Sequence, residues 1–248
     1  MSLDRRGLLL GAGGLLLGGC DRLSQSKPFQ GFLDAGEGLT SRVQRLIIPR
    51  DALAPEFSAA EMSPVFRTNG NSMPASPAYA QLLAGNFANW SLVVDGLVTR
   101  PLALSLEQIR GLPARTQITR HDCVEGWSAI GQWTGVPLAL LLKAAGLRSE
   151  ARYIVFHCAD DFGGTPYYES IDLIDAFHPQ TILAWGMNGR PLEVGHGAPL
   201  RLRVERQLGY KQAKYVMRVE AVDRLSRIGR GKGGYWEDVA GYQWYAGI

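Results

Sequence analysis

Apolar and polar residues follow a two-residue repeat along much of the second half of the chain, which is typical of strands with one buried face. The repeat is clearest in "APLRLRVE" and "KYVMRVEAVD", at residues 198–205 and 214–223. Two more uniformly apolar runs, 151–160 and 181–189, and a run at 90–98 that contains an Asp-Gly turn pair complete the predicted strands. The sequence therefore predicts a protein rich in strands.

Short helices are predicted between these strands from their start and stop signals. Residues 105–112 begin with an N-capping serine and end near a glycine, and 137–146 begin with proline and end with glycine. In residues 170–179, Ser170 is the predicted cap and Pro179 the breaker. Because no internal repeat or low-complexity tract is found, the predicted fold class is α+β, a mixed strand-rich core with short helices.

Composition and charge narrow the class of protein. The 248 residues are 46% hydrophobic and 20% charged, as in globular proteins, and the formal net charge is +3. A balance so close to neutral gives no electrostatic reason to expect binding to nucleic acid.

The N-terminus has the composition of a targeting segment. In residues 1–20, the pair Arg5 and Arg6 precedes an uncharged Leu/Gly stretch too short for the ~20 residues that span a bilayer. The pair resembles a twin-arginine (Tat) export signal, with ordinary Sec export as the alternative. "LGGC" resembles a bacterial lipobox, so Cys20 would be lipidated and Asp21 would favour retention at the inner membrane, unless the signal is simply cleaved. We expect a periplasmic protein that touches the membrane only through this anchor.

The two remaining cysteines allow several interpretations. Cys123 and Cys158 could form a disulfide in an oxidising compartment. Together with His121 and His157 they could also bind zinc or copper, although adjacent residues on a strand point to opposite faces. Cys123 is in addition surrounded by polar and acidic residues, which is unusual for a purely structural thiol.

Three separated motifs resemble the sulfite oxidase family of molybdopterin-dependent oxidoreductases. They are "CVEGWS…WTGVPL" starting at Cys123, "SPVFRTNGN" at residues 63–71 followed by "WSLVVDG", and "NGRPLEVGHGAPLRLRVERQLGYKQAKYV" at 188–216. "CVEGW" is nearest to the bacterial protein-methionine-sulfoxide reductase branch, whereas sulfite-oxidising members commonly have "CAGNR". The predicted layout is an export signal at 1–20, a linker or irregular arm at 21–60, the cofactor domain at 61–225 and a tail packed on it at 226–248.

The resemblance implies a molybdenum–molybdopterin cofactor without a nucleotide. Cys123 matches the thiolate ligand of the metal, and Arg201 and Lys214 match cations that hold the cofactor's phosphate. Further cofactor contacts are implied for Arg67, Asn69, Gly70, Asn71, Cys158, His196, Gln212 and Ala213. Without the other motifs, the basic residues between 201 and 214 would instead suit the solvated side of an edge strand. The resemblance assigns no role to Arg203, Arg206 and Lys211.

The resemblance also implies the activity. We expect two-electron oxygen-atom transfer, chiefly reduction of a sulfoxide-type small-molecule or protein-bound substrate, with Glu125 near the metal as a proton donor. Electrons would come from a separate partner, a membrane haem protein or a cytochrome, and the enzyme would be a monomer. The alternatives are a sulfite-type oxidase, a non-molybdenum thiol or zinc protein that uses Cys123, and a non-catalytic cofactor carrier.

Overall fold

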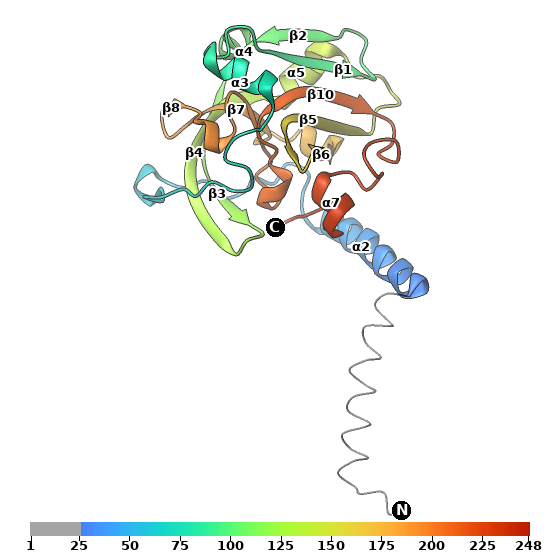
Figure 1. Ribbon diagram of the computed structural model, residues 1–248. Coiled ribbons are helices and arrows are strands. Elements are labelled where there is room, and N and C mark those ends of the chain that lie inside the picture. Colours follow the sequence, from blue (N-terminus) through green and yellow to red (C-terminus); the bar gives the residue numbers. More distant parts are fainter. Residues whose placement is uncertain (1–25) are drawn as a thin grey trace, which may run out of the picture. The chain divides into compact units, whose positions relative to one another are not determined.

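The computed structural model describes residues 26–248, which fall into two units divided between Pro49 and Arg50 (Figure 1). The predicted export signal and Cys20 lie outside the described residues. Within residues 26–248, none of the helices combines the length and apolar character that a membrane crossing requires.

The first unit contains helix α2, Lys27–Ile47, in the segment for which the sequence predicted an irregular linker. Pro28 lies in its first turn, and Leu39, Val43 and Leu46 recur at the four- and three-residue spacing of a helix face. The prediction of an irregular arm was wrong for this stretch. Its glycines are poor helix formers, so residue propensity favours an irregular segment here although the spacing of the apolar residues fits a helix.

The second unit, residues 50–248, contains two sheets. Its strands are β1 Ser91–Gly96, β2 Leu102–Ser105, β3 Arg115–Cys123, β4 Trp127–Pro137, β5 Tyr153–Phe162, β6 Thr165–Asp172, β7 Ile182–Met187, β8 Arg190–Pro191, β9 Arg201–Arg203 and β10 Val216–Val222. One sheet has the order β2-β1-β10-β5-β6, and in it β10 runs parallel to β1 and antiparallel to β5. The other has the order β3-β4-β7-β8, with β9 paired to β7 (Figure 1).

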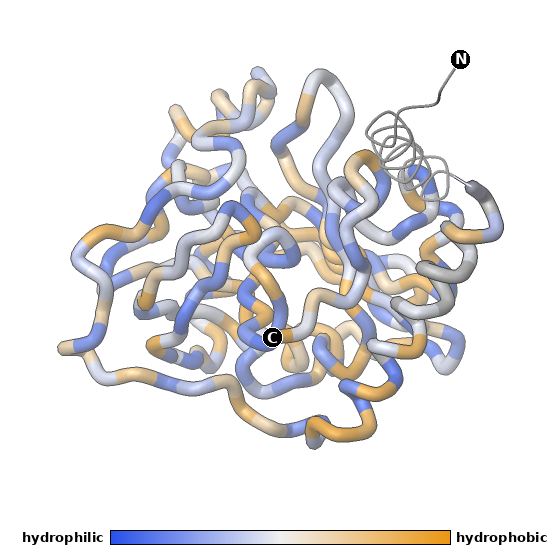
Figure 2. The backbone as a smooth tube through the Cα atoms, turned by 90° about the horizontal axis from the view of Figure 1, so that it is seen from below, coloured by the Kyte–Doolittle hydropathy of each residue, from blue (hydrophilic) through white to orange (hydrophobic). Residues whose placement is uncertain are grey.

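Short helices connect and cover these strands. They are α3 Pro77–Ala84, α4 Leu106–Arg110, α5 Leu138–Ala145, α6 Leu173–Ala176, α7 Tyr235–Ala240 and the 3-10 turns η1 Ala59–Glu61, η2 Val194–His196 and η3 Gly209–Lys211. The main core joins α5 with inward residues of both sheets, among them Leu92, Phe156 and Leu202. Hydrophobic and hydrophilic residues follow each other in short stretches along the chain, as expected for strands with one buried face (Figure 2). The predicted α+β, strand-rich class is confirmed.

Several boundaries differ from the sequence prediction for identifiable reasons. Asp172, not Ser170, caps α6, because the Asp172 side chain accepts a hydrogen bond from the Asp175 amide while Ser170 is still within β6. The strand predicted at 198–205 is limited to Arg201–Arg203, and it is buried on both faces rather than half-buried. The charged positions of this alternating pattern, Arg201 and Arg203, are buried rather than exposed to solvent.

The C-terminal tail, residues 226–248, belongs to the same compact unit as residues 61–225. It forms α7 and then a loop whose last residues bridge back to the segment between β9 and η3, at Gln207 and Gly247. The backbone amide of Leu208 also donates to the carbonyl of Ala246. The tail is therefore built into the domain as a helix and loop.

Candidate active site

Cys123 is the last residue of β3, where the hairpin to β4 turns. Gly126 takes φ +85°, a left-handed conformation that the tight turn requires, and its amide donates to the Cys123 carbonyl at 3.0 Å. The Cys123 side chain is only 9% exposed, and burial raises the pKa of its thiol. A thiol that stays protonated is a poor nucleophile, whereas a metal ion deprotonates it outright.

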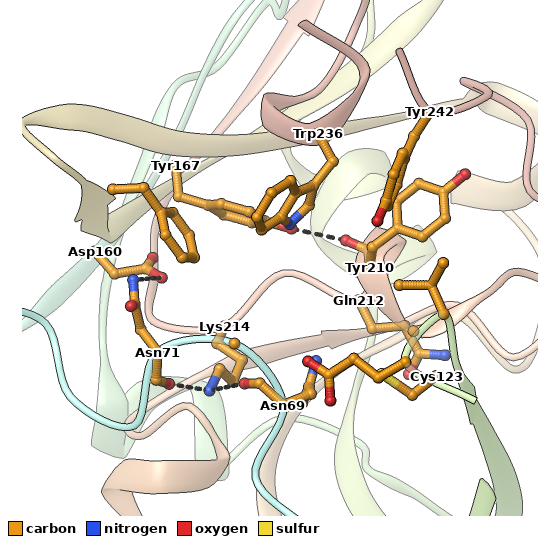
Figure 3. Close-up of a pocket in the computed structure, with 15 residues that line it drawn as sticks. Asn69, Asn71, Cys123, Asp160, Tyr167, Tyr210, Gln212, Lys214, Trp236 and Tyr242 are labelled. Carbon is orange, nitrogen blue, oxygen red and sulfur yellow. Dashed lines mark hydrogen bonds between the residues drawn. The ribbon is translucent and has the colours of Figure 1, made fainter. Parts of the chain in front are cut away.

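A cavity of about 290 Å³ lies beside Cys123 (Figure 3). Its lining residues come from the segment before α3, the β3–β4 hairpin, β5, β6, the η3 loop and the tail. They are Asn69, Gly70, Asn71, Cys123, Val124, Glu125, Asp160, Phe162, Tyr167, Gly209, Tyr210, Gln212, Lys214, Trp236 and Tyr242. Aromatic side chains lie along one side of this cavity, and Lys214 and Asn69 lie along the other (Figure 3).

Two buried cations lie on the polar side of the cavity, Lys214 in its lining and Arg201 bonded to the lining residue Asn69. Arg201 is fully buried, and burial and the nearby Arg203 lower its pKa to about 9. Lys214 is 5% exposed, and burial and Arg201 lower its pKa to about 7. Cations whose charge is disfavoured in this way are stabilised when an anion binds beside them.

The cations are held in place by hydrogen bonds to uncharged groups. Lys214 Nζ donates to the carbonyls of Asn69 at 2.7 Å and Gly195 at 3.0 Å, and also to that of Asn71. Arg201 Nη1 donates to the His196 carbonyl at 3.1 Å. Arg201 Nε is one of the buried side-chain polar atoms of residues 26–248 that have no hydrogen-bond partner. An unpartnered buried donor is expected where a polar ligand binds.

Arg203, which received no role from the sequence, is part of the support for this site. Its guanidinium forms an ion pair with Glu205 at 2.5 Å and lies 3.1 Å from Nδ1 of His121. The His121 pKa is lowered well below its usual value by burial and by Arg203, so the ring is neutral and accepts from the guanidinium. Trp133 lies beneath both arginines, with ring-centroid distances of 5.1 Å to Arg201 and 4.3 Å to Arg203.

Most of the implied site residues meet around the cavity. Seven line it directly: Asn69, Gly70, Asn71, Cys123, Glu125, Gln212 and Lys214. Arg201 joins them through Asn69, whose Oδ1 accepts from Arg201 Nη2 at 3.4 Å. Ala213 is buried next to Lys214, and its carbonyl accepts from the Leu202 amide at 2.8 Å.

Three implied residues lie elsewhere. His196 lines a neighbouring pocket with Phe66 and Met187. Cys158 lines a groove beside α3, its Sγ directed to the Phe156 carbonyl at 3.8 Å, and Arg67 is exposed and lines none of these cavities. The structure gives these three no place in the Cys123 cavity, and their cofactor contacts stay predictions.

The cavity also contains residues that sequence reasoning missed. Asp160 is 4% exposed, and burial raises its pKa to about 6; Asn71 Nδ2 donates to its Oδ2 at 3.2 Å. Trp236 and Tyr242 come from the tail, whose wealth of aromatic residues was a signal for a pocket rim. Asp160 gave no comparable signal, because it follows an ordinary strand pattern.

Comparison with known proteins identifies the family. The profile described as "Oxidoreductase molybdopterin binding domain" matches residues 80–228. A protein of Azospira oryzae with the provisional name protein-methionine-sulfoxide reductase subunit YedZ1 is 36% identical over 236 residues, which are 95% of this chain and 83% of that protein. This chain belongs to the family of molybdopterin-binding oxidoreductases.

Other relatives match a smaller share of their length. The protein-methionine-sulfoxide reductase catalytic subunits MsrP of Xanthomonas campestris and Campylobacter jejuni are 38% and 35% identical, over 55% and 56% of this chain and 46% and 51% of their own. The chain thus spans about half the length of these MsrP relatives. The sulfane dehydrogenase SoxCD of Paracoccus pantotrophus superposes with a TM-score of 0.50 at 25% identity, over 55% of this chain and 39% of that one.

The residues around the cavity fit a molybdopterin cofactor. A buried soft thiol, buried cations with lowered pKa values and the unpartnered Arg201 Nε suit a metal dithiolene that ends in a phosphate. The other interpretations of the cysteines find no support in the geometry. Cys123 and Cys158 are free thiols, and within residues 26–248 no three His, Cys, Asp or Glu side chains converge as a metal site.

Proposed function

We propose that this molybdopterin-dependent oxidoreductase reduces a sulfoxide to a sulfide by two-electron oxygen-atom transfer. The observation that carries the proposal is a single cavity in which the Cys123 thiol, the Lys214 ammonium and an aromatic side adjoin one another. The relatives named as methionine-sulfoxide reductase subunits support the same substrate class. The motif "CVEGW" at the thiol favours reduction over sulfite oxidation.

The reaction consumes two electrons and two protons and converts a sulfoxide into a sulfide and water. When bound, the cofactor supplies a metal that exchanges an oxygen atom and two electrons. The chain supplies the rest. Cys123 provides the protein ligand, while Arg201 and Lys214 hold the phosphate and so fix the position of the metal end.

Glu125 is the proton donor in this proposal. It is two residues beyond Cys123, lines the same cavity and is exposed enough to exchange protons with solvent. Its Oε2 accepts a hydrogen bond from Trp127 Nε1 at 2.9 Å, which fixes the direction of the carboxyl group. A carboxyl held in this way delivers a proton to the departing oxygen more efficiently than a mobile one.

We also propose that the protein works outside the cytoplasm and receives electrons from a separate subunit. The Arg5–Arg6 pair supports Tat export, which serves proteins that fold before transport, and "LGGC" supports a lipid anchor at Cys20. The word subunit in the relatives' names supports a separate electron donor, for which a membrane haem protein or a cytochrome is our candidate.

Metal and pterin analysis of the exported protein, combined with a dye-coupled assay, tests this function. We expect one molybdenum per chain, a sulfur neighbour from the protein in X-ray absorption, and reduction of sulfoxides faster than oxidation of sulfite. Cys123→Ala should lose that sulfur neighbour and the activity. A protein without molybdenum, or one that oxidises sulfite but reduces no sulfoxide, would contradict the proposal. Membrane association that is unchanged in Cys20→Ala would contradict the anchor.

A further inference from the structure

The side of the cavity opposite Lys214 is an aromatic wall built by distant segments of the chain (Figure 3). Its rings are Phe162, Tyr167, Tyr210, Trp236 and Tyr242. Trp236 stacks on Tyr242 with centroids 5.9 Å apart and planes 25° apart, and its edge meets Phe162 at 5.2 Å. Tyr167 is tied to the loop of Tyr210, because its hydroxyl donates to the Tyr210 carbonyl at 2.8 Å.

A buried ion triad is formed by three residues that are close in sequence to rings of this wall. Lys211 Nζ is 2.6 Å from Glu169 Oε2 and 2.5 Å from Glu237 Oε1. Glu169 and Lys211 are fully buried and Glu237 is 1% exposed. Burial raises the pKa of Glu169 and the neighbouring Glu237 raises it further, while Lys211 opposes the shift.

Each member of the triad is near one ring of the wall in the sequence. Glu169 follows Tyr167 by two residues on β6, Lys211 follows Tyr210 directly in η3, and Glu237 follows Trp236 directly in α7. The triad therefore joins the three segments that carry these rings.

The energetics of buried charges explain what such a triad contributes. Desolvation of buried ions offsets most of their attraction, so a buried ion pair adds little net stability compared with apolar packing. Its specific geometry, by contrast, fixes which groups meet, since leaving any one charge unpaired in the interior costs several kcal/mol. A triad here sets the relative positions of β6, η3 and α7 more than it stabilises the fold.

We propose that the aromatic wall determines substrate specificity by binding the apolar substituent on the sulfur of the oxo substrate, and that Glu169, Lys211 and Glu237 are the positioning residues that assemble it. This inference rests on the proposed sulfoxide reduction. The face of an aromatic ring binds an alkyl or aryl group without hydrogen bonds, while the opposite side, which contains Lys214, would hold the phosphate-bearing cofactor. Substrates with an aryl or long alkyl substituent should therefore bind more tightly than those with methyl groups alone.

Calorimetry with two unreactive sulfones tests the wall in the loaded enzyme. The wild type should bind methyl phenyl sulfone more tightly than dimethyl sulfone, and Trp236→Ala should reduce this preference by about tenfold because a stacking surface is lost. The matched control is Phe177→Ala, since Phe177 is 38% exposed and does not line the cavity. An equal affinity of the wild type for both sulfones, or an unchanged preference in Trp236→Ala, would overturn the proposal.

Variants of the triad test its positioning role. Glu237→Gln should lose the preference for methyl phenyl sulfone and the near-ultraviolet circular dichroism of the stacked Trp236 and Tyr242. Asp223→Asn removes a half-buried carboxylate outside the triad and should change neither. If Glu237→Gln does not fold, Glu169→Gln decides, because it leaves a balanced pair of Lys211 and Glu237. A folded triad variant with the wild-type preference and spectrum would show that the triad does not position the wall.

Kinetics with the two corresponding sulfoxides separate this inference from the proposed function. If the enzyme prefers methyl phenyl sulfone but reduces neither methyl phenyl sulfoxide nor dimethyl sulfoxide, the proposed function is wrong, but binding of the substituent by the aromatic wall still holds. If it reduces both sulfoxides with equal kcat/KM and binds both sulfones equally, the function remains and the wall is refuted.

Discussion

The backbone of Gly209 packs against the imidazole of His121, so closely that a Cβ on Gly209 would be 2.5 Å from His121 Nε2. His121 is on the strand that ends at Cys123, and Gly209 begins the turn that leads to Lys214. This contact packs the hairpin of Cys123 against the loop that leads to Lys214. It therefore sets the spacing between the proposed metal ligand and the proposed phosphate-binding cation.

Gly209→Ala should therefore destabilise the protein and lower its cofactor content together. We expect a loss of about 1–3 kcal/mol in the free energy of unfolding, because a methyl group must push His121 or the backbone aside. Denaturant unfolding and molybdenum analysis measure the two effects. Gly111→Ala is the control, since a Cβ there meets only ordinary contacts at 3.5 Å or more. Wild-type stability and metal content in Gly209→Ala would contradict the close packing.

Anion binding at the cation pair should weaken above neutral pH. The pKa of Lys214 is lowered to about 7, so without the cofactor the side chain is neutral at higher pH, and an anion then binds only with uptake of a proton. Sulfate, which keeps its charge from pH 6 to 9, should bind cofactor-free protein progressively more weakly above pH 7, by at most about tenfold per pH unit.

Lys214→Met should bind sulfate more weakly and without this pH dependence, whereas Lys143→Met, at an exposed position of α5, should behave as the wild type. Titration calorimetry at several pH values provides the measurement. Sulfate affinity that is independent of pH in the wild type would show that Lys214 keeps its charge.

Asp160 should make the native state less stable as the pH rises from about 4 to 6. Its pKa is raised from 3.8 to about 6 by burial, so in this window the native protein holds a proton that the unfolded chain has released. Above pH 6 the ionised, buried carboxylate still lowers the free energy of unfolding by about 2–3 kcal/mol. Asp160→Asn should thus gain stability relative to the wild type between pH 4.5 and 7, as measured by urea unfolding. Asp51→Asn, at an exposed site, should show no such change. If the free energies of unfolding of Asp160→Asn and the wild type differ by the same amount at pH 4.5 and at pH 7, the raised pKa of Asp160 is refuted.

Glu125→Gln should separate proton delivery from cofactor binding. Molybdenum content should equal that of the wild type, while sulfoxide reduction slows by about 100-fold, within the range for loss of a general acid. Glu107→Gln, at an exposed position of α4, serves as control. If reduction by Glu125→Gln is as fast as by the wild type, protons reach the substrate from another group.

Local signals predicted the parts of the fold that depend on neighbouring residues. Ser105 caps α4, and Gly146 ends α5 in the left-handed conformation, as expected from the sequence. The resemblance at the Cys123 motif also led to a thiol beside a cavity. These features were predictable because a cap, a turn or a hairpin is encoded within a few residues.

Long-range placement could not be predicted in the same way. Arg203 alternates with apolar residues as a solvated side chain would, yet its partners His121 and Trp133 come from other strands. Asp160 and Trp236 meet across the cavity only because β5 and the tail pack together. Alternation shows that one side of a strand differs from the other, but not what covers each side.

The position of Tyr242 in the cavity has a consequence for biogenesis. A ribosome-bound chain that has not yet released this residue lacks part of the enclosure around the pterin site. Enclosure of the cofactor site therefore requires that the tail has already packed on the domain.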